Sequence, residues 1–239
     1  MRPVGYICNP CELITVDLLN EIEECRKKCQ KVGIGIHSDL FFSQTFGRKP
    51  IKPFAEREKL IQALKGVDFT FELTAETDLR SEINISPVHT QTGYLKKYHV
   101  GYAPGTYDLF HEGHLEHLTE VKSLCDILVV GVNSDNLVFE NKQKRTRLPQ
   151  EERLKIVSNL SFVDYVYLVE DNNKSLANNW VKKNVGAPID AIFVGTDLQN
   201  QDFHNLENIP ILFTERDPVL MKMRCSTYYR DLLNSLQKK

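Results

Sequence analysis

The sequence predicts an α/β protein, in which a Rossmann-like parallel sheet flanked by helices is preceded by a truncated copy of the same fold. Two observations lead to this prediction. Short apolar runs typical of strands alternate with segments of helical periodicity, the pattern of a parallel sheet with crossover helices. The first part of that pattern occurs twice along the chain, which indicates an internal duplication.

The duplication has a constant offset of 96 positions, so that Val4 corresponds to Val100. VGY at 4–6 matches VGY at 100–102, and GIHSD at 35–39 matches GVNSD at 131–135. The same offset brings Pro53, Glu56, Arg57, Lys59, Leu64, Val67 and Asp68 onto Pro149, Glu152, Arg153, Lys155, Leu160, Val163 and Asp164. Matches spread this widely at one offset are unexpected by chance.

The correspondence stops after about Leu73, and this defines the domain organisation that we expect. Residues 1–73 form a degenerate, truncated repeat, residues 74–97 a linker, and residues 98–239 a complete domain. The linker is rich in Thr, Glu, Ser and Asn and contains Pro87, a composition typical of a connecting segment.

Each repeat is expected to run strand, helix, strand, helix, strand. In the second repeat, a β-branched and aromatic run at 97–104 ends at a proline and a glycine, as a strand entering a loop does. Apolar residues recur at helical spacing over 113–124, and a second helix is expected over 149–160. Further strands are expected at 126–132, 164–169, 190–195 and 209–214, with a last helix at 228–237.

The composition is that of a soluble globular protein, with 41% hydrophobic and 26% charged residues. A formal net charge of −2 gives no reason to expect a nucleic-acid partner. No apolar run approaches the roughly 20 residues that span a bilayer, and the N-terminus lacks the apolar core of a secretory signal. We therefore expect a cytoplasmic protein.

Four of the six cysteines fall in the first 29 residues, at Cys8, Cys11, Cys25 and Cys29. The CxxC at the first two is compatible with a zinc or redox site. The interpretation that we favour is reduced, partly buried thiols in a reducing compartment.

The segment GTYDLFHEGH at 105–114 joins the first strand of the second repeat to its helix, where doubly wound sheets bind ligands. Gly105 lets a phosphate approach the backbone, Gly113 lets the helix start pack tightly, and the helix N-terminus favours an anion. His111 and His114 are three residues apart, so both can point at the same oxygen atoms and stabilise a transferring phosphoryl group. A polar loop with two solvated histidines is the alternative, but the full string is more specific than a lone glycine-rich turn.

This string resembles the GxFDxxHxGH signature of the cytidylyltransferase-like nucleotidyltransferases, which include enzymes acting on glycerol 3-phosphate and on ethanolamine, choline and heptose phosphates. The resemblance covers nearly all of 98–239 and, more weakly, 4–73. It implies that His111 and His114 are catalytic residues that hold nucleotide phosphates. It also implies nucleotide-binding roles for Gly105, Thr106, Tyr107, Asp108 and Gly113.

Further matches to the family follow along the chain. Lys142 and Lys144 occupy the place of the family's loop lysines, and Gly195 and Asp197 that of its Gly-x-Asp. The closing motif, an arginine and a Ser-Thr pair before a helix, corresponds to Arg216 or Arg224 with Ser226 and Thr227. A solvated lysine, a loop aspartate and a plain helix N-cap are the alternative interpretations.

The chain departs from the family pattern at two places. Ser161 stands where the family has an arginine, so that Arg145 or Arg147 is the expected replacement. The spacing between Arg216 and the Ser-Thr pair is also longer than usual, which leaves open which arginine contributes.

The first repeat is not expected to be a second active site. His111 and His114 correspond to Thr15 and Leu18, and Asp108 corresponds to Glu12. Scaffold residues persist while the chemistry is lost. We hypothesise that this repeat is a built-in partner that forms a pseudo-dimer; a regulatory or vestigial appendage is the alternative, and homodimerisation stays open.

The resemblance implies transfer of CMP from CTP to a small phosphomonoester, such as phosphoethanolamine, phosphocholine or glycerol 3-phosphate, with release of pyrophosphate. Mg²⁺ is the expected cofactor because it offsets triphosphate charge, and no protein residue is assigned as its ligand. The alternatives are an adenylyltransferase that uses ATP with a sugar phosphate, and a non-catalytic nucleotide-binding regulatory protein.

Overall fold

The structure is a computed structural model that describes residues 2–74, 85–87, 96–195, 209–214 and 225–236. The chain divides into two compact units. One comprises Met1–Gln91 with Asn159–Ser161, and the other comprises Thr92–Ser158 with Phe162–Lys239. Each unit contains its own sheet.

The first unit has a four-stranded sheet in the order β1-β2-β3-β4. Its strands are β1 (Arg2–Asn9), β2 (Cys29–His37), β3 (Phe69–Leu73) and β4 (Ile85–Pro87). Its helices are α1 (Val16–Lys28), α2 (Asp39–Phe46) and α3 (Phe54–Gln62). The first three strands are parallel, and β4 pairs antiparallel with β3.

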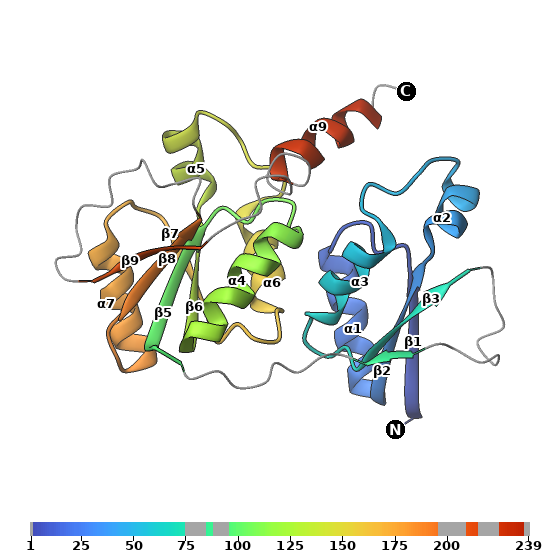
Figure 1. Ribbon diagram of the computed structural model, residues 1–239, viewed down its shortest axis with the longest axis horizontal. Helices are drawn as coiled ribbons and strands as arrows, with labels where there is room; N and C mark the ends of the chain where they lie inside the picture. The colour runs from blue at the N-terminus through green and yellow to red at the C-terminus, as the bar shows by residue number, and fades with distance from the viewer. Residues whose placement is uncertain (1, 75–84, 88–95, 196–208, 215–224, 237–239) are drawn as a thin grey trace. The chain divides into compact units, whose positions relative to one another are not determined.

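The second unit has a five-stranded sheet in the order β7-β6-β5-β8-β9, with every pair parallel. Its strands are β5 (Tyr98–Gly105), β6 (Cys125–Asn133), β7 (Tyr165–Val169), β8 (Ala191–Gly195) and β9 (Ile211–Thr214). Its helices are α4 (Glu112–Leu124), α5 (Asp135–Lys142), α6 (Gln150–Ser158), α7 (Lys174–Val185) and α9 (Ser226–Leu236). The predicted Rossmann-like parallel architecture is confirmed (Figure 1).

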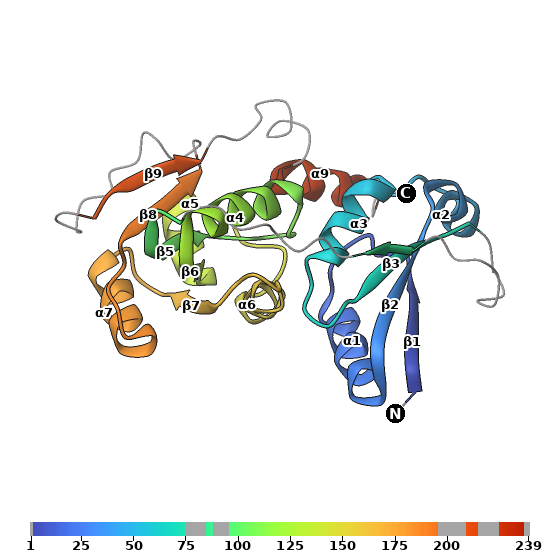
Figure 2. The same ribbon diagram turned by 60° about the horizontal axis from the view of Figure 1, so that its bottom comes forward.

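The strand order reverses at β5, and this determines where ligands bind in such a sheet. The chain moves from β5 through β6 to β7, then crosses back to β8 and β9. Because crossover connections are right-handed, α4 and α6 cover one face of the sheet and α7 the other (Figure 2). The carboxyl end of β5 therefore lies at the topological switch point, and the signature segment begins there.

The two units share six elements whose bounds differ by the same 96 positions: β1 and β5, α1 and α4, β2 and β6, α2 and α5, α3 and α6, and β3 and β7. The short helices α2 and α5 were not predicted, because eight residues span little more than two turns and carry too little apolar periodicity. The linker prediction also needs correction, because 74–97 contains the edge strand β4. The strand β4 pairs antiparallel with the strand before it, which requires only that the chain reverses direction. A run this short without strong strand character can form such a pair, so the sequence did not predict it.

The core of the second unit forms where α7 packs on the sheet. Ala177 and Val181 of α7 contact strand residues such as Val129 and Ile192, and Trp180 packs against Tyr167. In the first unit, Phe71 stands at the position of Tyr167, and its ring lies so close to Gly35 that a Cβ there would come within 2.7 Å. An aromatic ring thus covers this part of the first sheet. No helix in the described ranges is both long and apolar enough to cross a bilayer.

Candidate active site

The signature loop, residues 106–111, follows a tight path from β5 to the start of α4. Tyr107 and Leu109 adopt left-handed backbone conformations with φ of 53° and 49°, which non-glycine residues rarely hold. The Tyr107 hydroxyl donates to the Ala103 carbonyl at 3.1 Å, so its ring folds back over the strand end. A Cβ at Gly105 would lie 2.7 Å from that ring, which gives this glycine a packing reason in addition to its predicted role.

The two signature histidines stack at the beginning of α4. Their ring centroids are 3.8 Å apart and the ring planes differ by 28°. His111 is the N-cap residue and is buried, while His114 is half-buried with its ring against Tyr107 and Phe110. The three-residue spacing therefore brings both imidazoles to the N-terminal end of the helix, where the helix dipole favours an anion.

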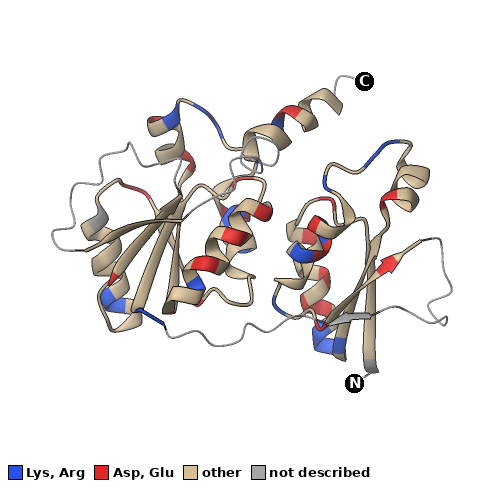
Figure 3. Ribbon diagram, viewed as in Figure 1, with Lys and Arg blue, Asp and Glu red and all other residues tan. Residues whose placement is uncertain are grey.

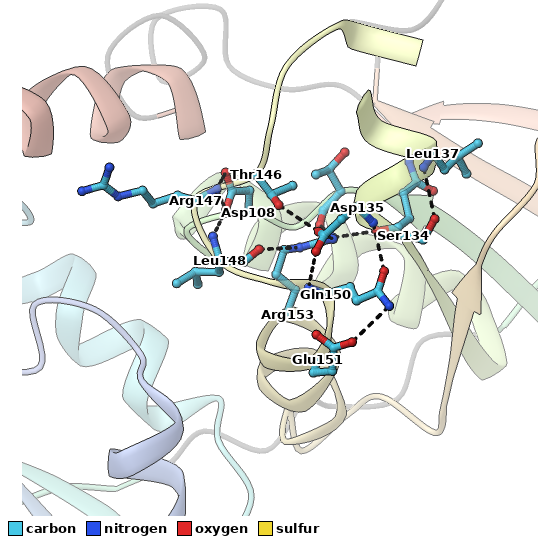
Figure 4. Close-up of polar contacts among 12 residues, drawn as sticks. Asp108, Ser134, Asp135, Leu137, Thr146, Arg147, Leu148, Gln150, Glu151 and Arg153 are labelled. Atoms are coloured by element: carbon cyan, nitrogen blue, oxygen red, sulfur yellow. Dashed lines mark hydrogen bonds and ion pairs between the residues drawn. The ribbon is translucent and has the colours of Figure 1, made fainter. Parts of the chain in front are cut away.

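Asp108 connects the signature loop to two other segments. Its buried carboxylate accepts the backbone N–H groups of Arg147 and Leu148 at 3.0–3.1 Å (Figure 4). The guanidinium of Arg230 on α9 donates to the same carboxylate at 2.7 Å. Because a buried carboxylate is stable only when paired, Asp108 fixes the loop before α6 and the helix α9 around the signature loop.

The Ser-Thr pair begins α9, as the sequence predicts. The Ser226 hydroxyl donates to the Asp108 carbonyl at 2.8 Å and lies 3.3 Å from Nε2 of His111. Since a hydroxyl has one proton, this donation leaves the Ser226 oxygen to accept from His111. Thr227 is exposed.

Two polar neighbours of the signature loop were missed by the sequence interpretation. His117 is buried one turn after His114, with Nδ1 2.6 Å from the hydroxyl of Thr214 at the end of β9. Arg230 is the ion-pair partner of Asp108. The signal for His117 was available, because it continues the three-residue spacing of His111 and His114. Arg230 follows Ser226 by one turn of the same helix, but nothing local identifies its partner.

The predicted lysines lie beyond β6. Lys142 is the last residue of α5, and its Nζ lies 3.4 Å from the Thr106 hydroxyl. Lys144 is exposed and lies in residues 143–147, which follow α5 and which we call the basic segment. Its cations are coloured blue after α5 in Figure 3. The resemblance placed both lysines in a loop after the second strand. Lys142 instead ends the helix α5, so only Lys144 lies in a loop.

A fully buried arginine, Arg153, ties these segments together. Its guanidinium donates to the carbonyls of Thr106 at 2.6 Å, Asn133 at 2.8 Å and Leu148 at 3.1 Å. It also donates to the Asp135 carboxylate at 2.6 Å (Figure 4). Burial raises the pKa of Asp135, but hydrogen bonds from Arg153 and from the Thr146 hydroxyl outweigh this and hold that pKa below its usual value.

A cleft of about 430 Å³ opens beside this framework, between α5 and the basic segment; we call it the α5 cleft. Charged, polar and aromatic side chains line it: Asp135, Asn136, Phe139, Arg145, Thr146 and Arg147. The Phe139 side chain is exposed, and the Arg145 guanidinium lies 5.9 Å from its ring centroid. Both arginines that we expected to replace the cation missing at Ser161 therefore line this cleft.

The remaining predicted residues are placed only in part. Gly195 is buried at the carboxyl end of β8, and Gly113 lies in the first turn of α4. Asp197, Arg216 and Arg224 lie outside the described residues. The four N-terminal cysteines are free thiols, with Cys8 exposed and Cys11 and Cys29 buried. Within the described ranges, no three His, Cys, Asp or Glu side chains gather as a metal site.

Comparisons with known proteins agree with the geometry. Bifunctional protein HldE of Campylobacter concisus (strain 13826) is 33% identical over 120 residues, which are 50% of this chain and 24% of that protein. Bifunctional protein HldE of Helicobacter pylori (strain P12) is 37% identical over 89 residues, which are 37% of this chain and 19% of that protein. The chain thus spans about a quarter or less of these curated relatives.

A solved structure, that of the lipopolysaccharide core biosynthesis protein from Thermoplasma volcanium GSS1, is similar over 50% of this chain and 96% of that chain. The sequence identity is 28% and the TM-score 0.41. The family model for cytidylyltransferase-like proteins matches residues 102–223, about half of the chain. The resemblance to the family is confirmed, and the chain belongs to the cytidylyltransferase-like family.

Proposed function

We propose that residues 98–239 form a nucleotidyltransferase that joins a nucleotide to a small phosphorylated alcohol. A phosphomonoester oxygen of the acceptor attacks the α-phosphorus of the nucleoside triphosphate in line. The new P–O bond forms as the bond between the α-phosphorus and the bridging oxygen breaks, and pyrophosphate leaves with the electron pair. CTP is the nucleotide that the family resemblance favours.

The observation that carries the proposal is the stacked histidine pair at the N-terminus of α4. His111 and His114 present two imidazoles 3.8 Å apart to the switch point of the sheet. Hydrogen bonds from imidazole N–H groups at this point become stronger as negative charge accumulates on the α- and β-phosphates. The helix dipole stabilises the same charge. Catalysis then comes from positioning and electrostatics, without a covalent intermediate.

The residues around the pair have complementary roles in this proposal. Lys142 and Lys144 supply cations for the phosphates, Thr106 supplies a hydroxyl, and Ser226, whose proton goes to the Asp108 carbonyl, positions His111. Gly105, Tyr107, Asp108 and Gly113 shape the loop that receives the nucleotide. Gly195, Asp197, Arg216, Arg224 and Thr227 keep the roles that the resemblance implies.

Mg²⁺ fits this site through the triphosphate rather than through a protein cage. The Asp108 carboxylate already accepts two N–H groups and a guanidinium, so we do not assign it as a metal ligand. Mg²⁺ commonly takes phosphate oxygens and retains several waters, which needs few protein ligands. When bound, it would offset the charge of the triphosphate.

The second candidate is an adenylyltransferase that uses ATP with a sugar phosphate. The relatives described above are named bifunctional protein HldE, and neither is named a cytidylyltransferase. ATP therefore belongs beside CTP in every assay. A non-catalytic nucleotide-binding protein is the third possibility, which a turnover measurement separates from both enzymes.

The test is pyrophosphate release with Mg²⁺, crossing CTP and ATP against phosphoethanolamine, phosphocholine, glycerol 3-phosphate and sugar phosphates. We expect turnover with one pair, and a His111→Ala variant to lower kcat by about 100-fold or more. His99→Ala is the matched control, because His99 is an exposed histidine near the other end of β5. Silence across the whole panel, or a His111→Ala variant as active as the control, would refute the proposal.

A further inference from the structure

The lining of the α5 cleft differs between the two repeats, although the framework around it does not. Asp135, Pro149 and Arg153 have identical counterparts at the offset of 96, namely Asp39, Pro53 and Arg57. Four lining residues, Asn136, Phe139, Thr146 and Arg147, instead correspond to Leu40, Ser43, Pro50 and Ile51, while Arg145 corresponds to another cation, Lys49. Most of the lining outside the framework has therefore diverged, as expected of a surface that contacts a ligand.

The α5 cleft adjoins the signature loop through two segments. At the end of α5, the Lys142 amine lies 3.4 Å from the Thr106 hydroxyl. At the other side, the backbone N–H of Arg147, a residue that lines the cleft, donates to the carboxylate of Asp108. The cleft and the signature loop are therefore connected through these two segments.

The charges of the cleft define the kind of molecule that fits. Arg145 contributes a guanidinium group, which can bind phosphate bidentately, whereas the Arg147 guanidinium lies 3.5 Å from the side-chain oxygen of Asn234 on α9. The Asp135 carboxylate also lines the cleft but is already paired with Arg153 and the Thr146 hydroxyl. The net field favours an anion and opposes a cationic group on the ligand.

The uncharged groups of the cleft suit a hydroxylated body. The Asn136 amide and the Thr146 hydroxyl can exchange hydrogen bonds with hydroxyl groups, and the exposed Phe139 ring offers an apolar surface for C–H groups. A quaternary ammonium group is typically recognised by a cage of aromatic faces. Here Arg145 already lies over the ring.

We propose that the α5 cleft binds the acceptor of the reaction and selects a phosphorylated polyol, such as a sugar phosphate or glycerol phosphate, over a phosphorylated amino alcohol. This inference rests on the proposed nucleotidyltransferase activity and decides between its acceptor classes. Phe139 and Arg145 are the specificity-determining residues, the ring for the polyol body and the guanidinium for its phosphate.

The experiment measures steady-state kinetics with the preferred triphosphate for Phe139→Ser, which installs the residue of the first repeat, and for Arg145→Ala. The controls are Leu176→Ser, an equally exposed apolar residue on α7, and Lys183→Ala, an exposed cation on the same helix. We expect each cleft variant to raise KM for the polyol phosphate about ten-fold. In the cleft variants, the KM for the triphosphate should stay within about two-fold of the wild-type value. In the two controls, the KM values for both substrates should do so.

Three results would overturn the assignment: turnover that favours phosphocholine or phosphoethanolamine, an unchanged acceptor KM in both cleft variants, or a rise in the triphosphate KM instead. A second measurement separates this from failure of the proposed function. Calorimetric titration of wild type and Phe139→Ser with glycerol 3-phosphate and hexose phosphates, without triphosphate, needs no turnover. If no pair of substrates reacts, the proposed function fails. The cleft site is still supported if the wild type binds a polyol phosphate and Phe139→Ser does not. It is refuted if both proteins bind equally or if neither binds.

Discussion

Lys52 is a cation with no exposed surface in the first repeat, at the position where the second repeat has Leu148. Its amine donates to the Glu12 carbonyl at 3.3 Å. Burial lowers the pKa of Lys52 to about 8, while the charges of Glu56 and Glu12 act in the opposite direction. The first repeat therefore carries a buried charge that the second repeat has replaced with an apolar side chain.

A Lys52→Leu substitution should stabilise the protein at pH 7. The folded-state pKa of about 8 lies below the unfolded value of about 10.4, so the unfolded chain binds more protons between these values. Wild-type stability should therefore rise as the pH increases through that window, and the penalty at pH 7 is about 1–3 kcal/mol after allowing for the lost hydrogen bond. Urea unfolding at pH 7 and pH 10 measures the difference between variant and wild type. If the difference in unfolding free energy between variant and wild type is as large at pH 10 as at pH 7, burial of the Lys52 charge does not destabilise the folded state.

The histidine pair was predictable at the scale of residues, whereas its neighbours were not. His111 and His114 lie within one turn of a helix, so a local spacing rule brings them together. Arg230 meets Asp108, and His117 meets Thr214, only after the sheet has formed, because these pairs are far apart in the sequence. No local pattern contains that information.

The helix α9 is attached to the signature loop at two points one turn apart. Ser226 contacts the Asp108 carbonyl and His111, and Arg230 pairs with the Asp108 carboxylate. Its start was predictable from the Ser-Thr pair, and its amphipathic sequence predicts the helix itself. The ion pair involves the buried carboxylate of Asp108, so this contact is where we expect the docking of the helix to be most sensitive.

Replacing Arg230 with Met should loosen α9 and reduce turnover together. The buried Asp108 carboxylate would lose its charged partner, so amide hydrogen exchange at 229–236 should accelerate and kcat fall by about ten-fold or more. Arg230→Lys should recover part of both effects, because it restores the charge without the planar donor fork. Asp231→Asn, an exposed change on the same helix, is the control. Faster exchange with unchanged turnover would mean that the position of α9 is irrelevant to the chemistry.

At the scale of the whole molecule, the duplication separates what the fold needs from what the reaction needs. Arg57 donates to the carbonyls of Lys52 and Pro10 and to Asp39, and Arg153 makes the same three bonds at equivalent positions. This framework is shared by the two repeats. It made the architecture predictable, because the same pattern of apolar residues and arginine occurs twice in the sequence. The short strand β4 and the helix α5 were not predictable, since their positions depend on packing rather than periodicity.

Equivalent carboxylates in the two repeats provide the corresponding test. Glu12 accepts the Ile51 backbone N–H and pairs with Arg48 at 2.6–2.7 Å, as Asp108 accepts the Arg147 N–H and pairs with Arg230. Asp108→Asn should lower kcat by about ten-fold or more, because it weakens the contacts that position the signature loop. Glu12→Gln should lower the thermal unfolding temperature but leave kcat and both KM values within about two-fold, since it acts only on scaffold.

Measuring both variants under one set of conditions distinguishes two accounts of the first repeat. If only Asp108→Asn affects turnover, the first repeat supports the molecule without taking part in the reaction. Deleting 1–73 then tests the built-in partner hypothesis, which predicts a less soluble or self-associating second repeat. If Glu12→Gln reduces kcat as strongly as Asp108→Asn, the state of the first repeat is coupled to catalysis, because the substitution changes no residue of the second repeat.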